Sequence, residues 1–207
     1  MRKKLILFDW GNIVEAHTTG YTCRAAWLDT FRACGYVGDK DIFDRLSKYR
    51  VSCIRDSLEF MNVYELLKKD FGFNKNFQEF VEIYLNIFDK IDYYEDVSNY
   101  EKSLRDKCYI GIFSNLTIFD KSRLDKQVNL SNYDYVFLSF EYGLRKPERE
   151  LYEIVQNKVP FEAKDILFID DRSDNIETAK EMGWNAFQST GLELDKIKEK
   201  CEEFLGN

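Results

Sequence analysis

The fold is decided by the stretch Lys4-Leu5-Ile6-Leu7-Phe8-Asp9-Trp10-Gly11-Asn12-Ile13-Val14. Leu5 to Phe8 is an unbroken apolar run, typical of a strand buried on both faces at the centre of a parallel sheet. Asp9 follows directly and therefore stands at the carboxyl end of this strand, the edge at which open α/β sheets bind ligands. Gly11 and Asn12 can then turn the backbone away from the sheet. Taken alone, Asp9 fits a turn cap equally well, so later segments have to decide its role.

Composition and charge narrow the class of protein. The 207 residues suit one domain, or one domain with an insert, and the 44% of hydrophobic residues can fill a sizeable core. The net charge of −7 argues against a nucleic-acid or anionic membrane surface, which needs a basic face. Five cysteines without C-x-x-C spacing favour free thiols in a reducing cytosol over a zinc site. The first apolar run is too short for a signal peptide, and no later stretch could span a bilayer, so we expect a cytoplasmic protein.

A long helical segment follows the first strand. From about residue 21 to residue 92 the apolar residues repeat at helical spacing, most clearly in the run Phe77, Phe80, Val81, Tyr84, Leu85 and Phe88. No strand pattern appears before about Lys107. The sequence therefore predicts an all-helical insert whose aromatic stripes are packing surface.

Strands and helices alternate in the rest of the chain. Buried-strand patterns occupy 108–113, 135–138, 166–169 and 185–188, and helical patterns occupy 97–105, 118–126, 147–157, 175–182 and 194–205. Pro147 is expected to be the first residue of its helix. Repeated β–α units with short links predict an α/β fold with a Rossmann-like parallel sheet.

Polar residues follow the strands at one edge of this predicted sheet. The groups are Asp9, Ser114-Asn115, Lys146-Pro147, and Asp170-Asp171 with Asp174-Asn175. Singly, each has a simple explanation, such as a helix cap or a solvated lysine. These separate explanations do not account for all the groups together. The carboxyl ends of parallel strands meet at one edge of the sheet, which brings these groups into one place.

Electrostatics then point to a metal ion. Asp9, Asp170 and Asp171 would converge with like charge, and one lysine cannot neutralise them. Mg²⁺ prefers oxygen ligands and usually combines one or two carboxylates with waters and a substrate phosphate. A metal, a lysine, a hydroxyl and an exposed carboxylate together suit phosphoryl transfer, in which the carboxylate attacks phosphorus.

These segments resemble the four motifs of the haloacid dehalogenase-like (HAD) hydrolase superfamily, in the same order and with similar spacing. The matching segments are Phe8-Asp9-Trp10-Gly11-Asn12-Ile13-Val14, Phe113-Ser114-Asn115, Leu144-Arg145-Lys146-Pro147-Glu148, and Phe168-Ile169-Asp170-Asp171-Arg172-Ser173-Asp174-Asn175. The helical insert lies where this family carries its helical cap domain. The resemblance implies a core domain of residues 1–18 and 95–207 and a cap domain of residues 19–94.

The resemblance also implies a metal site. Asp9 would be the nucleophile, and Asp9, the Gly11 carbonyl and Asp171 would hold Mg²⁺. Asp170 would lie beside the ion, and Asn175 would belong to the shell of residues that surrounds the metal ligands.

The phosphoryl group has its own expected partners. By the same resemblance, Ser114 and Lys146 would bind the phosphoryl group during catalysis, together with Asn115. Trp10 is expected either to pack beside the site or to present its ring to the substrate. The implied substrate is a small phosphomonoester, such as a sugar phosphate or a similar metabolite.

One position departs from the family pattern. Most phosphatases of the family carry a second Asp two residues after the nucleophile, where it protonates the leaving group and activates water; here that residue is Gly11. The D-x-G-N-V/I form is similar to a branch that includes phosphatases of the α-D-glucose-1-phosphatase kind. The acid/base role stays open, with Glu15 and His17 as candidates, and esters whose leaving group needs little protonation are expected to be preferred.

Two other functions remain open at this point. The 2-haloacid dehalogenases also lack the second Asp but need no metal, which leaves the pair Asp170-Asp171 unexplained. A catalytically weak binding or regulatory protein would also explain Gly11. Cap motion is expected about hinges near 18–20 and 92–96, and the residues near the first hinge are candidates for substrate contact: Thr18, Thr19, Tyr21 and Arg24.

Overall fold

A five-stranded parallel sheet forms the centre of the computed structural model, which describes residues 3–15, 21–38, 42–91, 95–127 and 129–206. The strand order is β3-β2-β1-β4-β5. The strands are β1 (Leu5–Phe8), β2 (Tyr109–Ser114), β3 (Tyr135–Leu138), β4 (Ile166–Asp170) and β5 (Asn185–Gln188). All four pairings are parallel, which confirms the predicted α/β, Rossmann-like fold.

The central position of β1 follows from its sequence. Leu5 to Phe8 are fully buried and pair with β2 on one side and β4 on the other. Ile6 and Phe8 pack into one core layer, and Leu5 and Leu7 pack into the layer on the opposite face. Side chains of a strand alternate between faces, so a strand covered on both sides has to be apolar throughout.

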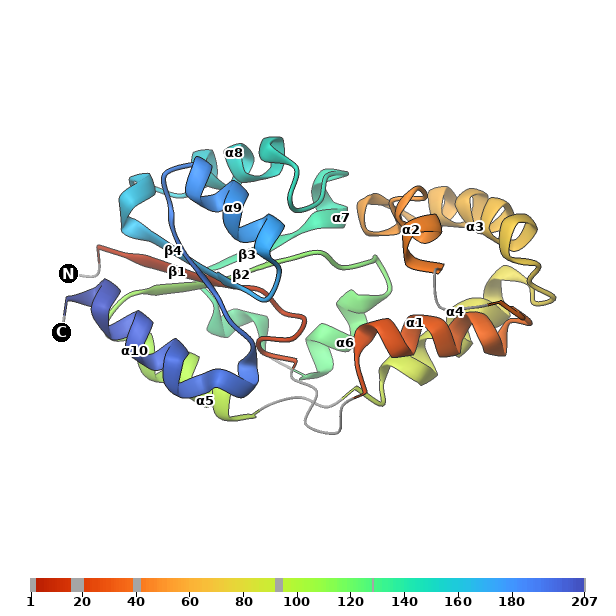
Figure 1. The fold of residues 1–207 in the computed structure, drawn as a ribbon, viewed down its shortest axis with the longest axis horizontal. Coiled ribbons are helices and arrows are strands. Elements are labelled where there is room, and N and C mark those ends of the chain that lie inside the picture. Colours follow the sequence, from red (N-terminus) through yellow and green to blue (C-terminus); the bar gives the residue numbers. More distant parts are fainter. Residues whose placement is uncertain (1–2, 16–20, 39–41, 92–94, 128, 207) are drawn as a thin grey trace.

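Helices cover both faces of the sheet (Figure 1). On one face lie α5 (Glu95–Leu104), α6 (Asp120–Gln127) and α10 (Leu194–Leu205), which contribute to the same core layer. On the other face lie α8 (Arg149–Lys158) and α9 (Ser173–Glu181). The sheet is therefore the middle of three layers, with its central strands buried and its edge strands β3 and β5 partly exposed.

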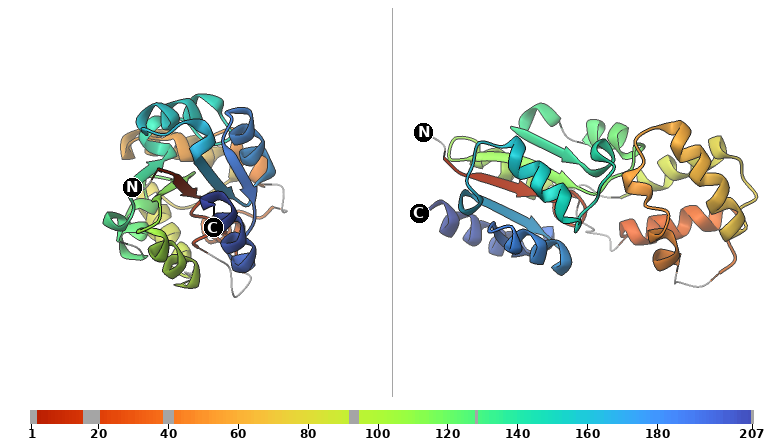
Figure 2. Two further views of the ribbon diagram at one scale, coloured as in Figure 1. Left: turned by 90° about the vertical axis from the view of Figure 1, so that its left-hand side faces the viewer. Right: turned by 90° about the horizontal axis from the view of Figure 1, so that it is seen from above.

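The predicted helical insert is helical and lies at one end of the molecule, beyond the carboxyl edge of the sheet (Figures 1 and 2). It contains α1 (Cys23–Ala33), α2 (Ile42–Ser47), the short helix η1 (Val51–Cys53), α3 (Ser57–Phe71) and α4 (Phe77–Phe88). Their aromatic stripes form a separate core, as expected, with Phe60, Tyr64, Phe80 and Tyr84 buried in it.

Local signals set the ends of these helices. Asn76 and Glu79 form a reciprocal capping box at the start of α4. Asp56 caps α3, which ends where Gly72 adopts a left-handed conformation with φ of +72°.

The structure differs from the sequence prediction at two places between β3 and α8. Pro147 is not the first residue of a helix: it lies in a turn closed by a hydrogen bond from Glu148 N to Arg145 O (2.8 Å), and α8 begins at Arg149. The short helix α7 (Ser139–Tyr142) was not predicted, because it depends on a tertiary contact from Ser139 Oγ to Ser52 O (2.6 Å).

Some predictions fall outside the described residues. These include His17, Thr18 and Thr19, most of both expected hinges, and the expected domain boundaries at 18/19 and 94/95. Within the described ranges, no helix combines the length and the apolar character that crossing a membrane requires.

Candidate active site

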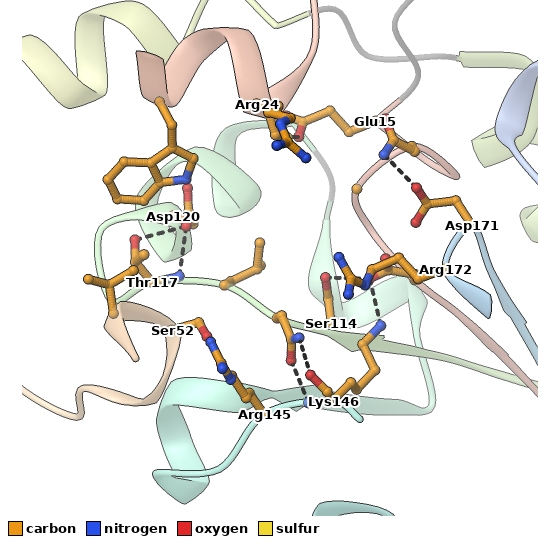
Figure 3. A pocket seen from close by; sticks show the side chains of 18 of the residues that line it. Glu15, Arg24, Ser52, Ser114, Thr117, Asp120, Arg145, Lys146, Asp171 and Arg172 are labelled. Atoms are coloured by element: carbon orange, nitrogen blue, oxygen red, sulfur yellow. Dashed lines mark hydrogen bonds and ion pairs between the residues drawn. The ribbon is translucent and has the colours of Figure 1, made fainter. Parts of the chain in front are cut away.

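The carboxyl edge of the sheet brings the predicted residues together. Asp9 directly follows β1, Ser114 ends β2, and Asp170 ends β4 with Asp171 after it. Lys146 reaches the same edge from the loop between α7 and α8. A cavity of about 710 Å³ opens here between the sheet edge and the helical segment (Figure 3). This volume is in the range of small-molecule sites.

Asp9 is held through one of its two carboxylate oxygens. Its Oδ1 accepts hydrogen bonds from Ser114 Oγ (2.6 Å) and from the backbone N–H of Trp10 (2.7 Å). Lys146 Nζ lies 2.9 Å from the same oxygen. Oδ2 accepts no hydrogen bond from any described residue, so one oxygen is fixed in place and the other is available for a ligand.

Lys146 lies between two carboxylates. Its Nζ is 2.6 Å from Asp170 Oδ2 and also donates to the carbonyl of Phe113 (2.8 Å). Burial disfavours the charged ammonium, but the attraction of Asp170 and Asp9 outweighs this and raises the pKa of Lys146 above its usual value. Lys146 is therefore a fixed, permanently charged group at this edge.

Asp170 has its acceptor positions filled. Besides Lys146, it accepts from Asn175 Nδ2 (2.9 and 3.0 Å) and from the backbone N–H of Arg172 (2.9 Å). Asp170 is fully buried. The geometry thus suits a residue that orients its neighbours.

Three carboxylates are crowded around this one lysine. Ligand oxygens of Asp9, Asp170 and Asp171 lie within 4.8 Å of one another. Burial, opposed by Lys146 and reinforced by Asp170 and Asp171, raises the pKa of Asp9 to about 7. Burial and then Asp170 also raise the pKa of Asp171, although Asn12 Nδ2 donates to it (2.8 Å). The cluster is short of positive charge.

The donor set fits a divalent cation with oxygen ligands. Asn175 Oδ1 is buried beside the cluster and has no hydrogen-bond partner, as expected for an acceptor placed to receive a metal-bound water. The carbonyls of Trp10, Asn12 and Glu15 accept backbone hydrogen bonds from described residues, whereas the Gly11 carbonyl accepts none from this part of the chain, and Gly11 lines the cavity.

Asn115 and Trp10 lie close to the cluster in different ways. The Asn115 side chain accepts from Lys146 N and donates to Lys146 O (both 2.9 Å), so it braces the lysine loop. The Trp10 ring is 1% exposed, packs in the core and does not line the cavity. Its large apolar surface favours that burial, and only its backbone N–H points at Asp9.

Glu15 is already paired. It forms a buried ion pair with Arg123, and Cys23 Sγ donates to its other oxygen (3.4 Å). Arg123 also contacts Asp120 Oδ1 (3.1 Å). Glu15 is thus not a free acid/base group beside Asp9.

Asp120 and Arg123 line the cavity and were missed from the sequence. Asp120 accepts from the N–H (2.7 Å) and hydroxyl (2.8 Å) of Thr117 and from Tyr84 OH of α4 (2.7 Å). The spacing Thr117-x-x-Asp120 is a helix-capping signature that locates this pair, but nothing in the sequence shows that Tyr84 completes it.

The other walls of the cavity carry further arginines. Arg24 extends from α1, and Arg145 extends from the lysine loop on the opposite side, near Ser52 (Figure 3). Arg172 makes a two-pronged contact with Asp174 (3.0 and 2.6 Å) and is largely exposed.

Comparisons with known proteins agree with this architecture. Residues 20–188 match the family model described as haloacid dehalogenase-like hydrolase. A curated D-ribitol-5-phosphate phosphatase from Bacteroides thetaiotaomicron is 27% identical over 197 residues, covering 89% of this chain and 91% of that protein.

Solved structures show the same fold. A predicted HAD-like hydrolase from Porphyromonas gingivalis has a TM-score of 0.72 at 20% identity and covers 97% of this chain and 98% of its own. A HAD family enzyme from Bacteroides thetaiotaomicron was solved with magnesium and inorganic phosphate. It has a TM-score of 0.69 at 16% identity, and the match covers 91% of this chain and 95% of that enzyme. The family match spans well over half of the sequence, and this chain belongs to the haloacid dehalogenase-like hydrolases.

Proposed function

We propose that this hydrolase is an Mg²⁺-dependent phosphatase that cleaves small phosphomonoesters through an aspartyl-phosphate on Asp9. The proposal is carried by one observation: three carboxylates lie within 4.8 Å of one another, and Ser114 and Lys146 both contact Asp9. This combination provides a nucleophile, a hydroxyl, a fixed cation and a site for a divalent ion in one cavity.

The metal would be held by Asp9, the Gly11 carbonyl and Asp171. Asp170 and Asn175 would support these ligands from the next layer, through the contacts that Asp170 makes with Lys146 and Asn175. The bound ion would supply positive charge for the phosphoryl oxygens.

The chain's own groups account for the transfer step. An Asp9 oxygen forms a bond to phosphorus as the ester P–O bond breaks, and the leaving group takes its proton from water. Lys146 stays held by Asp170 and the Phe113 carbonyl and presents its charge to the phosphoryl oxygens, and the Ser114 hydroxyl and the Asn115 backbone amide donate to the same oxygens. Water then attacks phosphorus, breaks the bond to Asp9 and releases phosphate.

The relatives support the same reaction class. The relative from Bacteroides thetaiotaomicron is named as a phosphatase of a polyol phosphate, and the magnesium and phosphate in the structural neighbour show that this fold can hold both. In this proposal residues 1–18 and 95–207 form the catalytic core, and residues 19–94 form a cap over the cavity. Trp10 packs beneath the site.

Hydrolysis of p-nitrophenyl phosphate by the wild type and by Asp9→Asn, with Mg²⁺ and with EDTA, tests the proposal. We expect metal-dependent turnover that falls at least about 10³-fold in the variant, as for loss of other catalytic nucleophiles. Asp29→Asn, an acid on α1 outside the cavity lining, is the matched control.

The other functions give different results. Chloride release from 2-chloropropionate that persists in EDTA would identify a dehalogenase. A folded wild type that binds Mg²⁺ but turns over neither compound would indicate a binding protein and contradict the phosphatase.

A further inference from the structure

Arg24 is a cation of the cavity that has no acidic partner among the described residues. Within the described part of the chain its guanidinium forms no ion pair and no hydrogen bond, and it stacks over the Phe43 ring at 4.2 Å. It lies in the first turn of α1, which contains no acidic residue. A positive charge at a helix N-terminus is unfavourable for the helix, so helix stability does not explain this arginine.

Arg145 is only weakly neutralised. Its nearest carboxylate, Glu148, lies 3.7 Å from Arg145 Nε. Glu148 is already engaged by both terminal nitrogens of Arg50, one of them at 2.8 Å. The charge of Glu148 is therefore largely neutralised by Arg50, and Glu148 neutralises Arg145 only weakly.

The remaining cations of the cavity each have close acidic partners. These pairs are Lys146 with Asp9 and Asp170, Arg123 with Glu15 and Asp120, and Arg172 with Asp174. Arg24 and Arg145 differ from them, and they project into the cavity from opposite walls, one from the helical segment and one from the lysine loop (Figure 3).

We propose that Arg24, with Arg145 opposite, binds a second anionic group on the leaving group of the substrate. The inference rests on the proposed phosphatase function and deepens it. The substrate is then a phosphomonoester whose far end carries a carboxylate or a second phosphate, such as a sugar-acid phosphate. Guanidinium groups match both anions with paired N–H donors.

Size and charge both favour this class. The cavity of about 710 Å³ has room for a leaving group of several carbons beyond the phosphoryl group. An uncharged polyol, as in the substrate named for the Bacteroides thetaiotaomicron relative, would leave Arg24 without a counter-charge from the described residues and Arg145 with only the shared Glu148. A carboxylate at the end of the same carbon chain would provide one.

Binding measurements with a matched pair of esters test the inference. D-ribonate 5-phosphate and D-ribitol 5-phosphate differ only in a carboxylate or a hydroxymethyl group at C1. We would titrate each into Mg²⁺-loaded Asp9→Asn, in which turnover is disabled. The expected preference for the ribonate ester is about tenfold or more, the size of one charge-assisted hydrogen bond.

Variants of α1 then assign the preference to one residue. Adding Arg24→Gln should reduce the preference to about threefold or less, whereas Arg32→Gln should keep it, because Arg32 pairs with Asp29 and does not line the cavity. D-ribitol 1,5-bisphosphate is the third ligand: tighter binding than the ribonate ester identifies phosphate as the second anion, and weaker binding identifies carboxylate.

Equal binding of the ribonate and ribitol esters, or tighter binding of the ribitol ester, would overturn the inference, as would an unchanged preference in Arg24→Gln. Hydrolysis of both esters by the wild type without preference would overturn it too and leave the phosphatase intact. Selective binding that depends on Arg24 without any hydrolysis would uphold the anion site and reject the phosphatase.

Discussion

Two buried clusters of charge face the same cavity and differ in how their charges are used. The catalytic cluster consists of Asp9, Asp170, Asp171 and Lys146 at the sheet edge. The junction cluster consists of Glu15, Asp120 and Arg123, which link the turn after β1 to α6. Both clusters contain more acids than cations, so net charge alone does not distinguish the catalytic cluster from the junction cluster.

Hydrogen bonding does separate them. In the junction cluster Asp120 accepts from Tyr84, Thr117 and Arg123, and both oxygens of Glu15 have donors. In the catalytic cluster Asp9 Oδ2 accepts nothing from the described residues, and Asn175 Oδ1 is a buried acceptor without a donor. An acidic cluster is thus a candidate for a ligand when acceptors remain open, and structural when they are filled.

The largest expected effect comes from adding an acid to the catalytic cluster. A Cβ atom at Gly11 would meet no atom within 4 Å, and its backbone is not left-handed, so Gly11→Asp fits without strain. An aspartate here can protonate the leaving group, and we expect turnover of alkyl phosphates to rise about 10²–10⁴-fold, the usual contribution of general acid–base catalysis.

Comparison of aryl and alkyl esters measures this effect. The wild type should prefer p-nitrophenyl phosphate, whose leaving group needs little protonation, and Gly11→Asp should reduce that preference. Gly11→Asn is the matched control because it has the same shape without a proton to give. An aspartate variant no faster than the asparagine variant would show that the site does not lack an acid.

Removing a cation should affect the two clusters differently. Arg123→Met leaves two buried acids without their cation and should lower the free energy of unfolding by about 3–5 kcal/mol. Lys146→Met should also destabilise the protein. Saturating Mg²⁺ should reduce the difference in free energy of unfolding between Lys146→Met and the wild type. It should leave the corresponding difference for Arg123→Met unchanged. Urea unfolding of the three proteins, with Mg²⁺ and with EDTA, measures both differences.

The reverse pattern would contradict the comparison. If Mg²⁺ removed the difference for Arg123→Met, the junction cluster would be the metal site. If Mg²⁺ raised the free energy of unfolding of neither the wild type nor Lys146→Met, the catalytic cluster would not hold the ion.

Glu101 of α5 extends the comparison to a buried acid that forms no ion pair with a described residue, although the charge of Lys102 acts on it. Burial raises the pKa of Glu101 to about 8, although Tyr133 OH donates to it (2.6 Å) and opposes the shift. The folded protein therefore keeps a proton that the unfolded chain loses above about pH 4.5. The associated stability is fully present below that pH and is lost as pH rises through 8.

The pH dependence of unfolding checks this smaller effect. Between pH 5 and pH 8 the wild type should lose on the order of 2–3 kcal/mol relative to Glu101→Gln, which carries no titrating proton at this position. Glu177→Gln, at an exposed position of α9, is the control and should follow the wild type. Parallel curves for the wild type and Glu101→Gln would mean that Glu101 is ionised in the folded protein.

Much of the fold could be predicted because its signals are local. The apolar run 5–8, the alternation after residue 97 and the aromatic stripe of 77–88 each depend on a short window of sequence, and all three appear as expected. Polar residues at strand ends could also be placed, because parallel strands present their carboxyl ends at one edge.

The remainder depends on contacts between distant segments. Arg123 and Asp120 look like surface residues of a polar helix, but Tyr84 of α4 donates to Asp120, and Arg123 lies against Glu15 and the Phe88 ring. Arg24 gave only a weak sequence signal, because its role depends on what lies near it in space, where no described acid pairs with it. Pro147 was placed in a helix because its ring suits a first turn, but the bonds between Asn115 and the Lys146 backbone hold that segment as a loop.

The strand order has a consequence for synthesis of the chain on the ribosome. β1 is the first of the five strands to be made, but it pairs with β2 on one side and with β4 on the other, so its second hydrogen-bonding edge stays open until Asp170 has been added. At about 5–20 residues per second this takes roughly 10–30 seconds, during which the helical segment can fold from contacts that are closer in sequence. A ribosome stalled before β4 therefore carries a chain in which the fully apolar strand β1 still has one open hydrogen-bonding edge, the species of this protein most in need of a chaperone.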